Sequence, residues 1–182
     1  MRITGGMARG LRLVVPPGLR VRPTSDRVRG ALFQLLAQEL VDSIVLDLYA
    51  GTGALGIEAL SRGAARVDFV ERVPRLGDVI ERNLESAGFG GRGKVYRAPV
   101  ERALGFLSGP YHLVLLDPPY ELPDVEHIMQ MLEGSGLLEK GGLVVLEHSS
   151  RITMAERYGL LRRKDQRHYG DTALSLYRME EA

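Results

Sequence analysis

The sequence predicts an α/β fold in which helices cover both faces of a mostly parallel sheet. Short apolar runs that are typical of buried strands alternate with longer segments whose apolar residues recur at helical spacing. A glycine-rich turn follows the first of these strands, and the end of the chain has the pattern of two strands around a tight turn. Alternation of strand and helix favours βαβ units and therefore parallel strand pairing.

The N-terminal segment is expected to be a small arm in front of the α/β domain. Residues 3–15 contain three glycines among alternating apolar residues and predict a β-hairpin or ribbon, which Pro16-Pro17-Gly18 ends. Capping residues at 24–26 then precede an apolar stripe at helical spacing, so a helix is expected from there to about Leu40. We accordingly divide the chain into an arm, residues 1–22, and a second domain, residues 23–182.

The rest of the chain alternates regularly between the two kinds of element. The expected strands cover residues 44–48, 67–70, 94–97, 113–116 and 143–146. The expected helices between them cover residues 53–61, 73–87, 99–107 and 124–133. Residues 159–167 and 172–178 are then expected to form a terminal hairpin around Tyr169-Gly170-Asp171.

Composition excludes several classes of site. The chain is 45% hydrophobic and 26% charged, as in an ordinary globular protein. Because it has no cysteine, it can have neither a disulfide framework nor a thiolate metal site, and its four histidines lack zinc spacing, so no metal site is expected. No apolar run resembles a signal peptide or a membrane span, and a cytoplasmic monomer is the expectation.

Positive charge is concentrated at the start of the chain. Residues 1–30 contain seven arginines and one acid, a net charge of +6, whereas the whole chain has +1. A basic segment on a nearly neutral body suggests a polyanionic partner such as nucleic acid. The alternative is a solvated surface in a protein that prefers arginine to lysine throughout. The candidate contacts are Arg2, Arg9, Arg12, Arg22, Arg27 and Arg29.

The tetrapeptide Asp117-Pro118-Pro119-Tyr120 directly follows an apolar strand. A carboxylate, a prolyl carbonyl and a flat ring can together grip a planar amino group. Methylation of an exocyclic nitrogen on a nucleobase requires such a grip, so these four residues are the candidate catalytic group. The simpler alternatives are a helix-capping acid at Asp117 and a core aromatic at Tyr120.

The first strand ends in an acid and a glycine loop. Gly51 and Gly53 allow the backbone to pass close to a ligand, and Glu71, which ends the next strand, is placed to accept both hydroxyls of a ribose. With Gly56, this spacing also satisfies the dinucleotide fingerprint, so a nicotinamide oxidoreductase is an alternative. Asp47 argues against it, because a carboxylate repels a pyrophosphate and attracts the ammonium of S-adenosylmethionine.

Several motifs together resemble the RsmD-type methyltransferases. The shared segments are Arg2-Ile3-Thr4-Gly5-Gly6, Arg9-Gly10-Leu11-Arg12, residues 22–29, residues 47–63, Asp117-Pro118-Pro119-Tyr120 and Tyr169-Gly170-Asp171-Thr172. The resemblance implies a Rossmann-like class I methyltransferase fold, with a seven-stranded, mostly parallel sheet and an antiparallel last strand. It also implies methyl transfer from S-adenosylmethionine to N2 of a guanine in small-subunit (16S) ribosomal RNA, naked or within an assembling 30S subunit.

The same resemblance adds three candidate cofactor residues to Asp47, Gly51, Gly53 and Glu71. Tyr49 stands where class I loops usually have glycine. Ala98 stands where relatives often have an acid for the adenine amino group, which leaves backbone and apolar contacts there. Thr24, just before the first helix, is expected to close over the methionine end of the cofactor or to lie in the RNA-binding segment.

The implied chemistry is a direct in-line displacement. Asp117 and the Pro118 carbonyl would accept hydrogen bonds from the amine and aim its lone pair at the methyl group, and Tyr120 would stack on the base. Other functions remain open on the sequence alone. They are adenine-N6 methylation of nucleic acid, nicotinamide-dependent oxidoreduction and RNA binding without catalysis.

Overall fold

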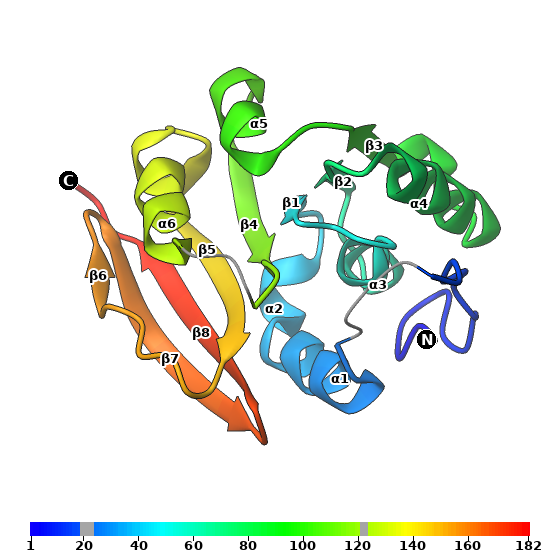
Figure 1. Cartoon of the computed structure of the whole chain (residues 1–182), viewed down its shortest axis with the longest axis horizontal. Helices are drawn as coiled ribbons and strands as arrows, with labels where there is room; N and C mark the ends of the chain where they lie inside the picture. Colours follow the sequence, from blue (N-terminus) through cyan, green and yellow to red (C-terminus); the bar gives the residue numbers. More distant parts are fainter. Residues whose placement is uncertain (19–23, 121–123) are drawn as a thin grey trace.

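A computed structural model describes residues 1–18, 24–120 and 124–182. These residues form an eight-stranded sheet in the order β3-β2-β1-β4-β5-β8-β7-β6 (Figure 1). Neighbouring strands are parallel from β3 to β5, whereas β8 pairs antiparallel with both β5 and β7. The last strand is therefore inserted between β5 and β7, as the fold prediction requires.

The boundaries of the elements are as follows. The strands are β1 Ile44–Leu48, β2 Arg66–Val70, β3 Gly93–Tyr96, β4 Tyr111–Leu116, β5 Leu138–Ser149, β6 Arg157–Tyr158, β7 Leu161–Tyr169 and β8 Thr172–Met179. The helices are α1 Asp26–Leu35, α2 Ala37–Leu40, α3 Ala54–Ser61, α4 Pro74–Ser86, α5 Val100–Phe106 and α6 Val125–Gly134, with a short 3₁₀ turn at Gly90–Arg92.

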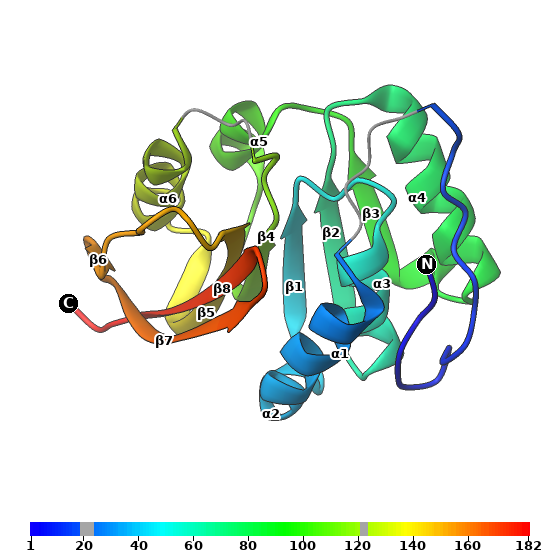
Figure 2. The same ribbon diagram turned by 60° about the horizontal axis from the view of Figure 1, so that its bottom comes forward.

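Two apolar cores lie on opposite faces of the sheet. Side chains alternate between faces along a strand, so Val45 belongs to one core and Leu46 to the other. The first core packs the sheet against α1, α3, α4 and the N-terminal arm, and the second packs it against α5 and α6. Figure 2 shows these two helical layers on either side of the central strands.

The predicted α/β fold is confirmed, with two differences in detail. The sheet has eight strands rather than seven, because the two-residue strand β6 pairs with the edge of β7. The helix expected from residue 26 to about 40 is interrupted at Leu36, which caps α1 and precedes α2. Both Leu36 and Leu40 are fully buried, so the interruption keeps both residues in the first core.

The N-terminal arm is an irregular hairpin that packs on the sheet domain. Its antiparallel pairing consists of one bridge between Arg2 and Arg12, flanked by backbone hydrogen bonds such as that from Ile3 N–H to the Leu11 carbonyl at 3.0 Å. Ile3 and Leu13 are buried in the first core. The arm is therefore fixed to the body by apolar contact as well as by hydrogen bonds.

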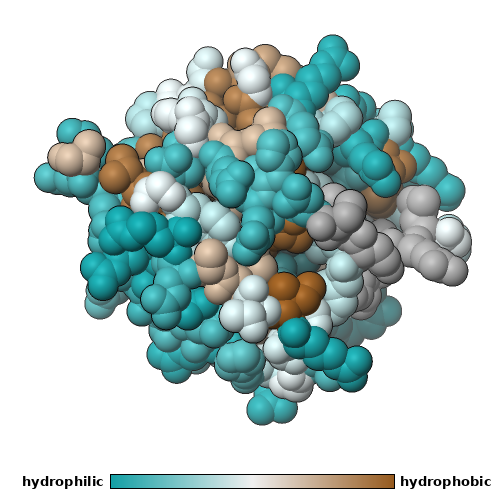
Figure 3. Space-filling view, turned by 60° about the vertical axis from the view of Figure 1, so that its left-hand side comes forward, coloured by the Kyte–Doolittle hydropathy of each residue, from teal (hydrophilic) through white to brown (hydrophobic). Residues whose placement is uncertain are grey.

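The surface beside the C-terminal hairpin is mainly hydrophilic. Figure 3 shows apolar side chains there only as small, separate patches among polar ones. Within residues 1–18, 24–120 and 124–182, no helix has the length and apolar character needed to cross a membrane.

Candidate active site

The glycine loop after β1 makes a sharp turn into α3. Tyr49, Gly51 and Gly53 all have left-handed backbone conformations, with φ of 58°, 59° and 84°. Gly53 is the N-cap of α3, and a Cβ atom there would lie 3.1 Å from the side chain of Ile80. Glycine is thus required at Gly53 by both backbone and packing, and the loop presents main chain rather than side chains to its surroundings.

Glu71 and the glycine loop are brought together as predicted. One carboxylate oxygen of Glu71 accepts a hydrogen bond from Gly51 N–H at 2.8 Å, and the other accepts one from Val73 N–H at 3.0 Å. The side chain is buried. Glu71 therefore holds the loop against the end of β2, and because a carboxylate accepts about four hydrogen bonds, these two contacts do not exhaust its capacity.

Asp47 is a buried carboxyl group with one unmatched oxygen. It is 1% exposed, and its Oδ2 accepts a hydrogen bond from Gly56 N–H of α3 at 3.0 Å. Its Oδ1 has no hydrogen-bond partner among the described residues. Burial raises the pKa of Asp47 to about 7, the nearby Glu71 raises it further and the Gly56 hydrogen bond opposes both. A buried oxygen without a donor is costly and suits a ligand that brings a donor of its own.

Tyr49 and Ala98 contribute apolar surface to the same end of the sheet. Tyr49 packs against the second core, and its hydroxyl is buried without a hydrogen-bond partner among the described residues. Burial and, secondarily, Glu101 raise the pKa of Tyr49 above its usual range. Ala98, two residues beyond β3, is buried and donates its N–H to the Tyr96 carbonyl at 3.2 Å. Neither residue adds a charge.

The Asp-Pro-Pro-Tyr segment follows β4 directly. The backbone nitrogen of Asp117 lies 3.5 Å from the Leu48 carbonyl at the end of β1, so the segment begins beside the glycine loop. Pro118 is buried, whereas Asp117 is half-buried and Pro119 is exposed. The Tyr120 hydroxyl lies within hydrogen-bond distance of Thr172 Oγ1 on β8, at 3.1 Å. This contact ties the aromatic ring to the terminal hairpin.

Thr24 joins Asp117 to a second carboxylate that sequence reasoning did not identify. Its hydroxyl donates to Glu147 Oε2 at 2.7 Å and lies 3.4 Å from Asp117 Oδ2. Thr24 and Glu147 are both buried. A signal for Glu147 exists in the sequence, because Leu143-Val144-Val145-Leu146-Glu147 repeats the pattern of the strand that ends in Asp117.

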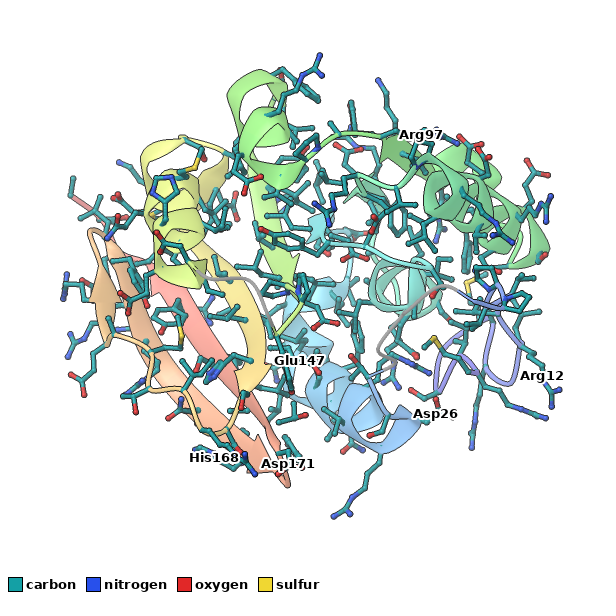
Figure 4. The ribbon with its side chains drawn as sticks, viewed as in Figure 1. Arg12, Asp26, Arg97, Glu147, His168 and Asp171 are labelled. Atoms are coloured by element: carbon teal, nitrogen blue, oxygen red, sulfur yellow. The ribbon has the colours of Figure 1, made fainter. Side chains whose placement is uncertain are left out.

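The predicted RNA-binding arginines divide into distinct groups. Arg2, Arg9, Arg12 and Arg27 are exposed. Arg9 and Arg27 line one hollow of about 510 Å³ between the arm and α1, together with Arg62. Figure 4 shows Arg12 at the outer edge of the arm. Arg22 lies outside the residues that the structure describes.

The expectation that Arg29 contacts RNA is wrong for this structure. Its side chain is fully buried, and its guanidinium bonds to Glu58 Oε1 at 3.1 Å and to Asp26 Oδ1 at 2.9 Å. It also donates to the backbone carbonyls of Arg2 and Thr24. A guanidinium with these partners is a structural link between arm, α1 and α3, and it does not reach the surface.

Comparison with known proteins is consistent with this arrangement. The family model described as Conserved hypothetical protein 95 matches residues 1–178. The chain is 36% identical to "Ribosomal RNA small subunit methyltransferase D" of Escherichia coli (strain K12), covering 99% of this chain and 90% of that protein. It is 32% identical to "Putative rRNA methyltransferase YlbH" of Bacillus subtilis (strain 168), covering 98% of each.

Solved structures show the same architecture. The "Putative methyltransferase yhhF from Escherichia coli" superposes with a TM-score of 0.90 and 31% identity over 100% of this chain and 99% of that one. An RNA methyltransferase from Salinibacter ruber, solved with S-adenosyl-L-homocysteine, has a TM-score of 0.71 and 17% identity over 88% of this chain and 95% of that one, and it supports the fold alone. The chain therefore belongs to the Conserved hypothetical protein 95 family, that of the RsmD-type methyltransferases.

Proposed function

We propose that this protein transfers a methyl group from S-adenosylmethionine to the exocyclic N2 amine of a guanine in small-subunit ribosomal RNA. The observation that carries the proposal is the position of Asp117. It directly follows β4 and begins beside the end of β1, where the glycine loop starts. A carboxylate for the substrate amine and a backbone loop for the cofactor therefore share one edge of the sheet, where ligands of doubly wound folds bind.

The residues at this edge fit the proposed cofactor. The orphaned Oδ1 of Asp47 suits an ammonium group, and Glu71 at the end of β2 suits the hydroxyls of a ribose. Gly51 and Gly53 let the backbone approach closely, and the apolar surface of Ala98 suits the adenine. When bound, S-adenosylmethionine supplies an electrophilic methyl group on a sulfonium. The protein's task is then to hold the amine in line with that methyl group.

Asp117 and the Pro118 carbonyl are proposed to position the amine. The lone pair of a guanine N2 is delocalised into the ring, so the amine is a weak nucleophile. Hydrogen bonds accepted by Asp117 and by the Pro118 carbonyl draw the nitrogen towards tetrahedral geometry and hold its lone pair towards the methyl group. Tyr120, tied to Thr172, would stack on a base that has been splayed out of the RNA.

The exposed arginines are proposed to bind RNA phosphates. Arg9, Arg27 and Arg62 surround one hollow beside α1, and Arg2 and Arg12 lie on the adjacent arm. Three cations around a concave surface favour a polyanion. The relatives named as ribosomal RNA methyltransferases support ribosomal RNA as that polyanion.

The proposal is tested by mapping methylated nucleosides. Ribosomal RNA from a strain that lacks this gene is incubated with the protein and labelled S-adenosylmethionine, and the modified nucleoside is identified by mass spectrometry. We expect N2-methylguanosine at one site. Asp117→Ala should abolish transfer and leave the cofactor dissociation constant nearly unchanged, because the contact acts on the substrate amine. Label in N6-methyladenosine, or near-native turnover by the variant, would refute the assignment.

A further inference from the structure

The strands β4 and β5 end in two carboxylates at the same level of the sheet. The parallel register pairs Leu113 with Leu143 and Leu116 with Leu146, and the next residues are Asp117 and Glu147. Side chains at equivalent positions of adjacent parallel strands point to the same face. Figure 4 shows Glu147 between β5 and helix α1, near the end of β4.

Thr24 fixes the spacing of these two carboxylates. Its hydroxyl lies 2.7 Å from Glu147 Oε2 and 3.4 Å from Asp117 Oδ2, so these oxygens are no farther apart than the sum of the two distances. A hydroxyl has one proton, and the shorter contact is the hydrogen bond. Glu147 is 3% exposed and Asp117 is half-buried, which places Glu147 at the inner end of the slot that Asp117 opens.

Two adjacent acceptors match one base edge and oppose another. The Watson–Crick edge of guanine carries the N1–H and N2–H donors side by side, whereas adenine presents an N6 amine next to an N1 lone pair. A carboxylate is an acceptor and has no proton to offer an N1 lone pair. An acceptor beside Asp117 therefore favours guanine and rejects adenine by electrostatic repulsion.

We propose that Glu147 determines specificity for guanine by accepting a hydrogen bond from N1–H while Asp117 accepts one from N2–H. The inference rests on the proposed function and adds the residue that selects the base. A carboxylate accepts about four hydrogen bonds, so the Thr24 contact leaves Glu147 able to bind a base. A site built to bond a substrate N–H rejects analogues without it more strongly than an apolar pocket rejects a missing methylene.

The test uses an RNA in which the target guanine is replaced by 2-aminopurine. This analogue keeps the N2 amine and has a lone pair in place of N1–H. Single-turnover rates are measured for both RNAs with the native protein, Glu147→Gln and Asp117→Asn. The native protein should prefer guanine by about 100-fold or more. Glu147→Gln, whose amide can donate to the N1 lone pair, should reduce that preference by about 10-fold or more.

Two controls separate base recognition from a structural role. Asp117→Asn should slow both RNAs by the same factor, because both carry the amine. Thr24→Val, which removes the hydroxyl that positions the carboxylates, should also slow both alike. If Glu147→Gln slows both RNAs equally, Glu147 only holds Thr24 and the inference is overturned. If the native protein methylates neither RNA but does methylate an adenine, the proposed function fails instead.

Discussion

Glu71 shows how one side chain can serve both the loop and its ligand. Its two oxygens already accept Gly51 N–H and Val73 N–H, so ribose hydroxyls would join an acceptor that the backbone has oriented. Hydrogen bonds to a charged group contribute about 1.5–3 kcal/mol each. Glu71→Ala should therefore weaken S-adenosylmethionine binding by at least about 10-fold. Calorimetry measures the dissociation constant, with a thermal melt as the folding control, and an unchanged constant would exclude the ribose role.

Asp47 makes the stability of the protein depend on pH. Burial raises its pKa from 3.8 to about 7, so in this window the folded state holds a proton that the unfolded chain releases. The contribution of Asp47 to the free energy of unfolding therefore falls as the pH rises from about 4 to 7, by about 1.4 kcal/mol for each unit of pKa shift. Above the folded-state pKa the full penalty is present.

Asp47→Asn removes this titration and keeps the shape of the side chain. Its unfolding free energy relative to the native protein should rise between pH 5 and pH 8, because only the native protein acquires a buried charge. Denaturant melts of both proteins at the two pH values measure the difference, and other titrating groups cancel in it. A difference that does not change with pH would show that Asp47 is already ionised at pH 5.

Individual residues show what can be predicted from sequence. Asp117, Glu71 and Gly51 could be placed, because each is tied to the end of a strand by a local pattern. The assignment of Arg29 is wrong, because the arginines of the arm look alike until the fold brings Glu58 of α3 against one of them. Glu147 escapes prediction because its partner Thr24 is 123 residues away along the chain.

Elements can be predicted where their pattern is long and not where it is short. The five parallel strands and their helices follow from periodicity. The interruption at Leu36 leaves the helical spacing of the apolar residues intact, and the two residues of β6 are too few to show a period. The sequence predicts the arm as a hairpin, but its attachment through Ile3 and Leu13 depends on a core formed elsewhere.

The arm should contribute a salt-dependent part of RNA affinity. Deleting residues 1–15 is unsuitable as a test, because Ile3 and Leu13 belong to the core. Changing Arg9 and Arg12 to alanine removes exposed charge only. For every phosphate that the variant no longer binds, the slope of log affinity against log salt should flatten by about 0.7–0.9.

The matched control for the arm is Arg97→Ala. Arg97 is already paired with Asp78 at 2.8 Å and Glu81 at 3.2 Å, and it lies away from Arg12 in Figure 4. This variant should keep the native salt slope. RNA affinity is measured across a salt series for all three proteins. Parallel lines for the native protein and the arm variant would mean that Arg9 and Arg12 bind no phosphates.

At the scale of the whole molecule, a buried ionic network joins the arm to the sheet domain. Glu58 of α3 accepts from Arg29 Nε at 3.1 Å and Arg62 Nε at 3.0 Å, and also from the backbone N–H groups of Thr4 and Gly5. Arg29 in turn reaches the Arg2 carbonyl. The network brings the arm, α1 and α3 together around one carboxylate, so the position of Thr24 above Asp117 and Glu147 depends on it.

Removing Arg29 should therefore destabilise the fold rather than RNA binding as such. Breaking a buried ion pair from one side leaves an uncompensated charge and costs about 3–5 kcal/mol, and the carbonyls of Arg2 and Thr24 are also deprived of a donor. Arg29→Ala should lower the free energy of unfolding by an amount of this order. Arg27→Ala, in the same helix and exposed, should change it by no more than about 0.5 kcal/mol. Denaturant melts of the two variants decide between the roles, because equal stability combined with a selective loss of RNA affinity in Arg29→Ala would restore Arg29 to the RNA-binding surface.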